Sequence, residues 1–139
     1  MRSPLLLVTS LLPAGWLTDC TRTASSRALI EYRRSGGFAG LDDHLVIQED
    51  GKAILTRKTG RSEFVLDDAT MNQLRVLFDE AEFSKLRREY LPRRKGSDLF
   101  EYVMTHKGHT VRTLDTAVPE SLQPILKVLN QIVESDGRP

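Results

Sequence analysis

Two histidines of this 139-residue chain come closest to the spacing of a metal site. His106 and His109 flank Lys107-Gly108, a pair typical of a tight turn, so their rings can approach each other across a hairpin. A zinc site needs three or four ligands, and neither a cysteine cluster nor a nearby glutamate completes one. The pattern therefore favours a histidine pair at the surface of a hairpin over a metal site, and we expect no cofactor.

The nucleophilic side chains lack the neighbours that catalysis requires. Ser35 has no histidine close to it in the sequence, and Cys20 is the only cysteine and belongs to the N-terminal segment. Acidic pairs occur at Asp42-Asp43 and Asp67-Asp68, and the second pair fits the start of a helix, where carboxylates complement the helix dipole. A nucleophile with its base and orienting acid is not visible, so the sequence predicts a protein without catalytic activity.

A glycine-rich run around a single aromatic side chain is the most distinctive motif. It reads Ser35-Gly36-Gly37-Phe38-Ala39-Gly40 and lies between two strand-like stretches. Glycine adopts positive φ without a steric clash, so the run predicts a sharply shaped loop. Phe38 either folds back against the sheet edge or projects as a docking anchor. Because most large aromatic side chains are buried, we favour the first for Phe38 and regard Leu41 as the better exposed candidate.

The N-terminal segment has the features of an export signal. A short basic start precedes an apolar stretch at residues 5–12, which is shorter than the roughly 20 residues of a membrane-spanning helix. Leu17 and Cys20 match a bacterial lipoprotein cleavage box, in which the cysteine becomes the lipidated first residue, whereas Asp19 departs from it. We predict a signal peptide at residues 1–19 and a lipid anchor at Cys20, with plain secretion or a misassigned start codon as alternatives.

The rest of the chain suits one folded domain. Residues 20–27 are small and polar, as in a flexible tether, the domain is expected at residues 28–134, and residues 135–139 form a frayed tail. A net charge of +1 and 40% hydrophobic residues give no general bias toward nucleic acid and suffice for a single core. We expect an exported monomer without a nucleic-acid partner, either secreted or held at the cell envelope.

Alternation of apolar and polar residues predicts the strands. The expected ranges are 29–34, 44–49, 52–58, 99–105 and 110–114, with a further short extended piece at 62–66. Asp50-Gly51 predicts a tight hairpin turn between the second and third strands.

Helical spacing of apolar residues predicts two helices. The first begins at Asp67 or Asp68, and its apolar side carries Met71, Leu74, Leu77, Phe78 and Ala81. The second begins near Ser121 or Gln123, because Pro124 is tolerated only in a first turn, and its apolar stripe comprises Leu122, Ile125, Leu126, Leu129, Ile132 and Val133. The order βββαββα predicts an α+β fold, in which a small antiparallel sheet of four to five strands packs on two helices. The other sheet face, with Glu31 and Arg33, is then either solvated or used for binding.

Several segments are similar to the emfourin family. The opening motif is Tyr32-Arg33-Arg34-Ser35-Gly36-Gly37-Phe38-Ala39-Gly40, and the later matches are Leu74, Leu77, Ala81-Glu82-Phe83, Leu86, Asp98-Leu99-Phe100-Glu101-Tyr102 and Val118-Pro119-Glu120-Ser121-Leu122-Gln123-Pro124-Ile125. The resemblance covers nearly all of residues 28–133. Emfourin is a protein inhibitor of thermolysin-like zinc metalloproteases such as protealysin. The export signal and the basic run Arg93-Arg94-Lys95 depart from the family pattern.

This resemblance implies that the chain inhibits such a protease by blocking its active-site cleft with the glycine-rich loop. The expected protease-binding residues are Ser35, Gly36, Gly37, Phe38, Ala39, Gly40, Leu41, Asp42 and Asp43. In this interpretation Phe38 or Leu41 supplies an apolar anchor, and Asp42 and Asp43 approach the metal or an arginine of the cleft. The alternative is an envelope-anchored binding module without inhibitory activity.

A basic segment follows the first helix. Residues 85–95 contain six basic side chains against one acid, Glu89, which gives a local charge of +5. The basic side chains are Lys85, Arg87, Arg88, Arg93, Arg94 and Lys95. Contact with anionic lipid headgroups or docking of an acidic partner are open interpretations, and a solvated loop is the favoured one.

Overall fold

The computed structural model describes residues 27–94 and 96–137. The predicted signal peptide, the lipid anchor at Cys20 and the tether up to residue 26 lie outside the described residues, as does Lys95. Within the described part, no helix is long and apolar enough to cross a membrane.

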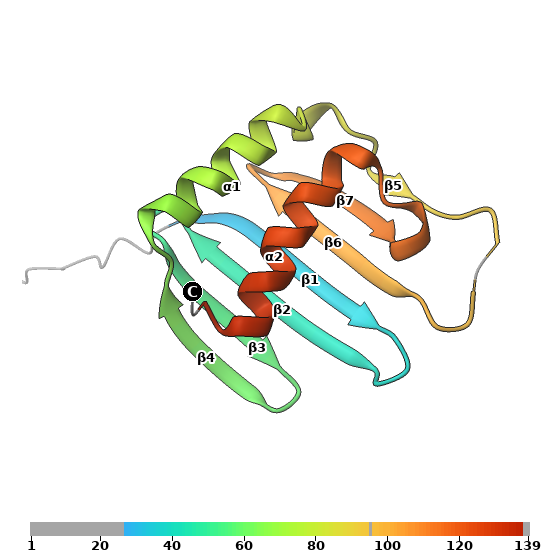
Figure 1. Cartoon of the computed structure of the whole chain (residues 1–139), viewed down its shortest axis with the longest axis horizontal. Helices are drawn as coiled ribbons and strands as arrows, with labels where there is room; N and C mark the ends of the chain where they lie inside the picture. The colour runs from blue at the N-terminus through green and yellow to red at the C-terminus, as the bar shows by residue number, and fades with distance from the viewer. Residues whose placement is uncertain (1–26, 95, 138–139) are drawn as a thin grey trace, which may run out of the picture.

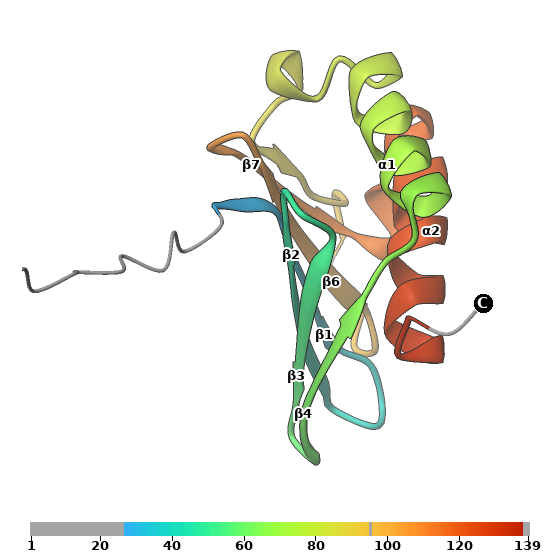
Figure 2. The same cartoon turned by 90° about the vertical axis from the view of Figure 1, so that its left-hand side faces the viewer.

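One mixed sheet is covered on a single face by two helices (Figures 1 and 2). The strands are β1 (Ala28–Gly36), β2 (Leu41–Gln48), β3 (Lys52–Arg57), β4 (Gly60–Val65), β5 (Glu89–Tyr90), β6 (Phe100–His106) and β7 (His109–Leu114). The helices are α1 (Asp68–Glu80) and α2 (Gln123–Ser135), with short 3₁₀ turns η1 (Phe83–Lys85), η2 (Asp115–Ala117) and η3 (Glu120–Leu122). The seven strands lie in the order β4-β3-β2-β1-β6-β7-β5.

The sheet is larger than predicted, and the prediction of four to five antiparallel strands was wrong. The expected short extended piece is a full edge strand, β4, which pairs with β3 from Lys52↔Val65 to Arg57↔Gly60. None of its residues is fully buried, and residues 60–63 include no large apolar side chain, so this part lacks the apolar alternation that marks a half-buried strand. The other edge is β5, which pairs with β7 in the parallel direction, and two residues are too few to show a period.

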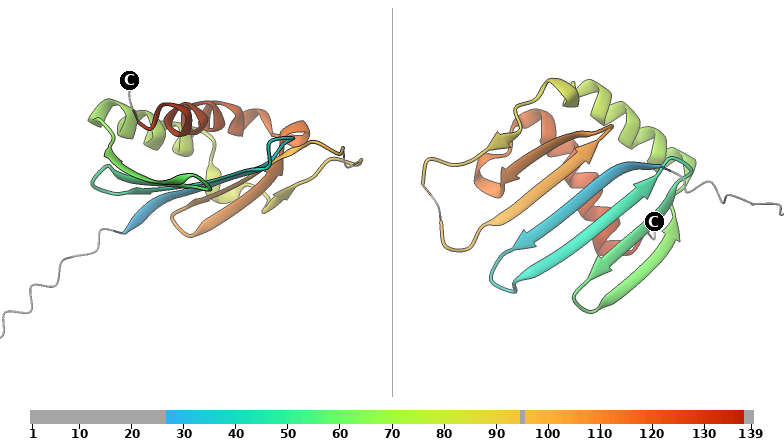
Figure 3. Two further views of the ribbon diagram at one scale, coloured as in Figure 1. Left: turned by 90° about the horizontal axis from the view of Figure 1, so that it is seen from below. Right: turned by 180° about the vertical axis from the view of Figure 1, so that it is seen from behind.

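The helices cover one face of the sheet and leave the other face open (Figure 3). Successive residues of a described strand alternate between these two faces. On β1, the side chains of Ile30 and Tyr32 are buried under the helices, whereas Glu31 and Arg33 are exposed on the other face. The core consists mainly of aliphatic side chains from the strands and from the apolar stripes of α1 and α2. The two-layer arrangement is the one that an apolar sheet face requires in order to leave water.

Local signals determine where both helices begin. The Oδ1 oxygen of Asp67 accepts a hydrogen bond from the Thr70 backbone N–H at 2.6 Å, which confirms the predicted cap. Hydrogen bonding by the Thr70 side chain, and to a smaller extent by its backbone N–H, lowers the pKa of this carboxyl group. Helix α2 begins at Gln123 with Pro124 in its first turn, as predicted. At its end, Asp136 adopts a left-handed conformation with φ of 51°.

A buried ion cluster connects the sheet to the end of α2. The carboxylate of Asp43 on β2 has only 5% of its side chain exposed and accepts hydrogen bonds from Arg34 on β1 at 2.8 and 3.1 Å. Arg57 on β3 approaches the other carboxylate oxygen at 3.6 Å. Burial opposes the charged state of Arg34, but its hydrogen bonds with Asp43 and Glu134 outweigh this effect and raise its pKa.

The same two arginines reach the last turns of α2. Arg34 donates to the side chains of Asn130 and Glu134, both at 3.2 Å. Arg57 donates to the backbone carbonyl of Val133 and to the carboxylate of Asp136, which lies 2.6 Å away. Arginines from β1 and β3, which share Asp43 of β2, therefore hold the end of this helix through hydrogen bonds and ion pairs in addition to apolar packing.

We expect the substitution Asp43→Asn to lower the free energy of unfolding by about 3 kcal/mol, because it leaves two partly buried guanidinium groups without their shared counter-charge. The matched control is Asp42→Asn, whose carboxylate pairs with the exposed Arg33 and whose loss changes stability by less than about 1 kcal/mol. Urea denaturation of both variants measures the difference. Equal effects would contradict the role assigned to Asp43.

Candidate functional site

The glycine-rich loop is the turn of the β1–β2 hairpin. The last strand pair is Gly36↔Leu41, and the four residues between them make the turn, with the Gly40 N–H donating to the Gly37 carbonyl at 2.9 Å. Gly36, Gly37 and Gly40 have φ of 103°, 69° and 59°. These values lie in the region that favours glycine, so the prediction of a sharply shaped loop is confirmed.

Neighbouring segments support the loop on two sides. The Gly37 N–H donates to the carbonyl of Leu99 at 3.3 Å, and Lys58 in the β3–β4 turn donates to the carbonyl of Gly40. A Cβ atom on Gly36 would lie 2.5 Å from the Leu99 carbonyl oxygen, and one on Gly37 would lie 2.5 Å from the ring of Phe100. The glycines therefore serve close packing as well as positive φ. Sequence reasoning missed Lys58, Leu99 and Phe100, because only the pairing of β1 with β6 brings the last two to the loop.

Phe38 projects from this loop with 97% of its surface exposed, so the favoured prediction that it folds back was wrong. The ring of Phe100 already fills the space beside Gly37. Leu41, which we regarded as the better exposed candidate, is half-buried at the start of β2. The loop therefore presents Phe38 and the exposed Ala39 at its tip.

The acidic residues that follow the loop point to opposite faces of the sheet. Asp42 lies on the open face, where its carboxylate pairs with Arg33 at 2.9 Å. Asp43 lies under α2, where Arg34 and Arg57 occupy its two oxygens. Ser35 lies opposite Asp42 in the strand register and is half-buried. The structure thus brings Phe38 and Ala39 together at the tip and places Asp43 away from it.

A shallow hollow lies beside the loop on the open side of the sheet. Its lining includes Ser35 and Gly36 from β1, Leu91, Gly96, Ser97 and Leu99 from the β5–β6 connection, and Glu101, Arg112 and Leu114 from β6 and β7. Arg112 is paired with Glu101 at 2.5 Å, and this contact raises the pKa of the guanidinium group. The hollow connects the loop to the basic segment.

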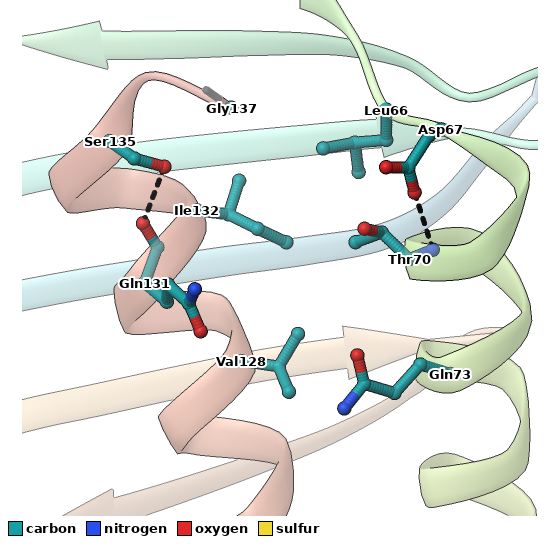
Figure 4. Close-up of a pocket in the computed structure, with 9 residues that line it drawn as sticks. All are labelled: Leu66, Asp67, Thr70, Gln73, Val128, Gln131, Ile132, Ser135 and Gly137. Atoms are coloured by element: carbon teal, nitrogen blue, oxygen red, sulfur yellow. Dashed lines mark hydrogen bonds between the residues drawn. The ribbon is translucent and has the colours of Figure 1, made fainter. Parts of the chain in front are cut away.

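A second hollow lies between the two helices near the start of α1 and the end of α2 (Figure 4). Two of its polar side chains already have partners: Asp67 caps α1, and the hydroxyl of Ser135 donates to the Gln131 carbonyl at 2.8 Å. Apolar side chains of Leu66, Val128 and Ile132 form the rest of its wall. Because Asp67 is the one titratable side chain among the described residues of the lining and already caps α1, this hollow offers little chemistry to a ligand.

The prediction that the two histidines of the β6–β7 hairpin form a pair at the surface was wrong. His106 is only 7% exposed and stacks on Phe78 with ring centroids 4.3 Å apart. His109 approaches the carbonyl of Leu86 through Nε2 at 3.0 Å. Burial, and to a smaller extent Lys107, lower the pKa of His106, while Asp79 opposes this shift. Over residues 27–94 and 96–137, no three His, Cys, Asp or Glu side chains gather as a metal site requires.

Comparison of the chain with models of protein families and with curated proteins found no match in either set. The loop and the surfaces beside it are therefore the features of this protein that bear on its function.

A lowered pKa in the folded state makes His106 a source of acid sensitivity. The unfolded state takes up a proton as pH falls below about 6.5, whereas the folded state resists it, so stability is lost as pH decreases from there. We expect His106→Phe to reduce this loss between pH 7 and pH 5, as measured by urea denaturation. The control His44→Gln leaves the buried ring of His106 in place, so we expect it to keep the loss of stability between pH 7 and pH 5. An unchanged pH dependence in His106→Phe would contradict this explanation.

We expect Gly36→Ala to destabilise the protein more than Gly108→Ala does. Both glycines have positive φ, which costs an alanine about 1–2 kcal/mol. A Cβ atom at Gly36 would also meet the Leu99 carbonyl at 2.5 Å, whereas nothing lies within 4 Å of one at Gly108. Thermal unfolding of the two variants separates steric contact from backbone strain. Equal losses would show that the Leu99 contact does not restrict the loop.

Proposed function

We propose that this protein is a non-catalytic inhibitor of thermolysin-like zinc metalloproteases and that its glycine-rich loop blocks their active-site cleft. The observation that carries the proposal is the 97% exposure of Phe38 at the tip of a loop that is held on two sides. The similarity of residues 28–133 to the emfourin family suggests the class of target.

An exposed aromatic ring contributes free energy to binding when a partner buries it. Leaving a phenylalanine in water forgoes about 1.5–3 kcal/mol that its burial would contribute. A partner pocket that takes a bulky apolar side chain recovers this energy when the ring enters it. Because the loop is already shaped by its glycines and by the contacts of Lys58 and Leu99, little conformational entropy is lost on docking.

The inhibitory surface in this proposal is narrower than the predicted set of nine residues. Phe38 is the anchor and Ala39 lies beside it, while the remaining loop residues shape the turn. Asp42 can meet a polar group of the cleft only by sharing or giving up its ion pair with Arg33. Asp43 stabilises the base of the hairpin and does not contact the protease.

The test is a titration of thermolysin, and in parallel protealysin, with the protein at fixed enzyme concentration. We expect stoichiometric loss of activity with the wild-type protein. Phe38→Ala should weaken inhibition about a hundredfold, as for a central interface anchor worth about 2.7 kcal/mol. The matched control is Val65→Ala, which removes another exposed apolar side chain, 68% accessible, from the edge strand β4.

The outcomes separate three cases. Loss of inhibition in Phe38→Ala but not in Val65→Ala supports the proposal. Inhibition that is equal in all three proteins keeps the function but excludes Phe38 as its anchor. If the wild-type protein inhibits neither enzyme, the proposal fails, and a binding module without inhibitory activity becomes the better interpretation.

A further inference from the structure

A second exposed surface lies along the same side of the molecule as Phe38. We propose that the exposed arginines between η1 and β6 form a second contact site for the inhibited protease and that they fit an acidic surface beside the cleft. We define the basic arm as Arg87, Arg88, Leu91, Arg93 and Arg94. This inference rests on the proposed function, since it assigns a partner surface to the same complex.

The chain path connects the basic arm to the loop. After β5, residues 91–94 lead away from the edge of the sheet, and residues 96–99 lead to the start of β6 beside the β1–β2 hairpin (Figure 1). There Leu99 accepts the hydrogen bond from Gly37. Leu91, Leu99 and Gly36 all line the hollow beside the loop. The arm and the loop therefore border one continuous stretch of surface.

The arginines of the arm differ from those of the sheet in having no carboxylate partner. In the sheet, Arg33 pairs with Asp42, Arg61 with Glu63 and Arg112 with Glu101, at 2.9, 2.6 and 2.5 Å. Among the described residues, no ion pair involves any arginine of the basic arm, and all four are exposed. The chain as a whole carries only +1, so its excess positive charge is concentrated here.

The arm also contains apolar and aromatic groups of the kind that interfaces bury. The guanidinium group of Arg87 lies 4.7 Å from the centroid of the Tyr90 ring, and Leu91 is 45% exposed. Arginine, tyrosine and apolar anchors together are typical of the centre of a protein interface. Guanidinium groups match carboxylates in a two-pronged geometry, so the fitting partner is a protein surface rich in Asp and Glu.

The two contact sites are expected to act on different rate constants. Unpaired surface charges steer an oppositely charged partner and raise the association rate, while a buried apolar anchor slows dissociation. The basic arm therefore governs how fast the inhibitor finds the protease. Phe38 governs how long the complex lasts.

The experiment compares progress curves of thermolysin and protealysin inhibition at several salt concentrations. The variant is Arg93→Glu/Arg94→Glu, and the control is Lys107→Glu/Lys127→Glu, which makes the same change in net charge in the β6–β7 turn and on α2. We expect the arm variant to associate at least about tenfold more slowly at low salt and to lose most of the salt dependence. A third variant, Arg93→Lys/Arg94→Lys, keeps the charge and should keep most of the rate.

Each result decides the inference. If the arm variant and the control associate with the protease equally fast and with the same salt dependence, the basic arm does not contact the protease. The proposed inhibitory function is not contradicted in that case. If the wild-type protein inhibits neither enzyme, this inference and the proposed function fail together. If inhibition is unchanged but binding to phosphatidylserine vesicles is lost only in the arm variant, the arm recognises a membrane and the inference is overturned.

Discussion

The structure depends most on the buried carboxylate of Asp43 between two guanidinium groups. Arg34 and Arg57 extend from the strands on either side of β2 and share this one counter-charge, then use their remaining donors on the end of α2. A slip of one residue in the register would move Asp43 to the open face and leave both arginines without it. The ion pairs and the apolar packing therefore favour the same pairing of β2 with β1 and β3. An apolar core alone would specify this pairing less strictly.

That register determines the shape of the hairpin. Because Arg34 lies opposite Asp43, the next pairs are Ser35↔Asp42 and Gly36↔Leu41, and only residues 37–40 remain to reverse the chain. A turn of this length beside the Leu99 carbonyl and the Phe100 ring has no room for a side chain on its inner side. Phe38 is exposed because the Leu99 carbonyl and the Phe100 ring already occupy the space beside Gly36 and Gly37. The ion cluster at the base of the hairpin fixes the register that leaves Phe38 at the tip.

The sequence was informative where one side chain determines local geometry. The Asp67 cap, the first-turn Pro124 and the turn glycines were predicted because each acts within a few residues of itself. His106 was predicted to lie at the surface and Phe38 to fold back, and both predictions were wrong, since both outcomes depend on elements distant in the chain. The polar residues Arg34, Asp43 and Arg57 lie under α2 at positions where a simple alternation would place apolar side chains. Sequence periodicity therefore predicted the two helices but neither the size of the sheet nor the ion cluster beneath α2.

The open face of the sheet is uncovered (Figure 3), yet it is less suited to binding than Phe38 and the basic arm. Its charged groups are paired with one another: Arg33 with Asp42, Glu31 with His44 and Arg112 with Glu101. A partner docking there would have to replace these pairs or bury them, and burying ion pairs often gives no net gain. Phe38 and the basic arm carry no such internal partners among the described residues, so a matching surface adds contacts without removing any. The internal pairing of charges, more than the area left open, indicates which part of this small sheet protein can bind another molecule.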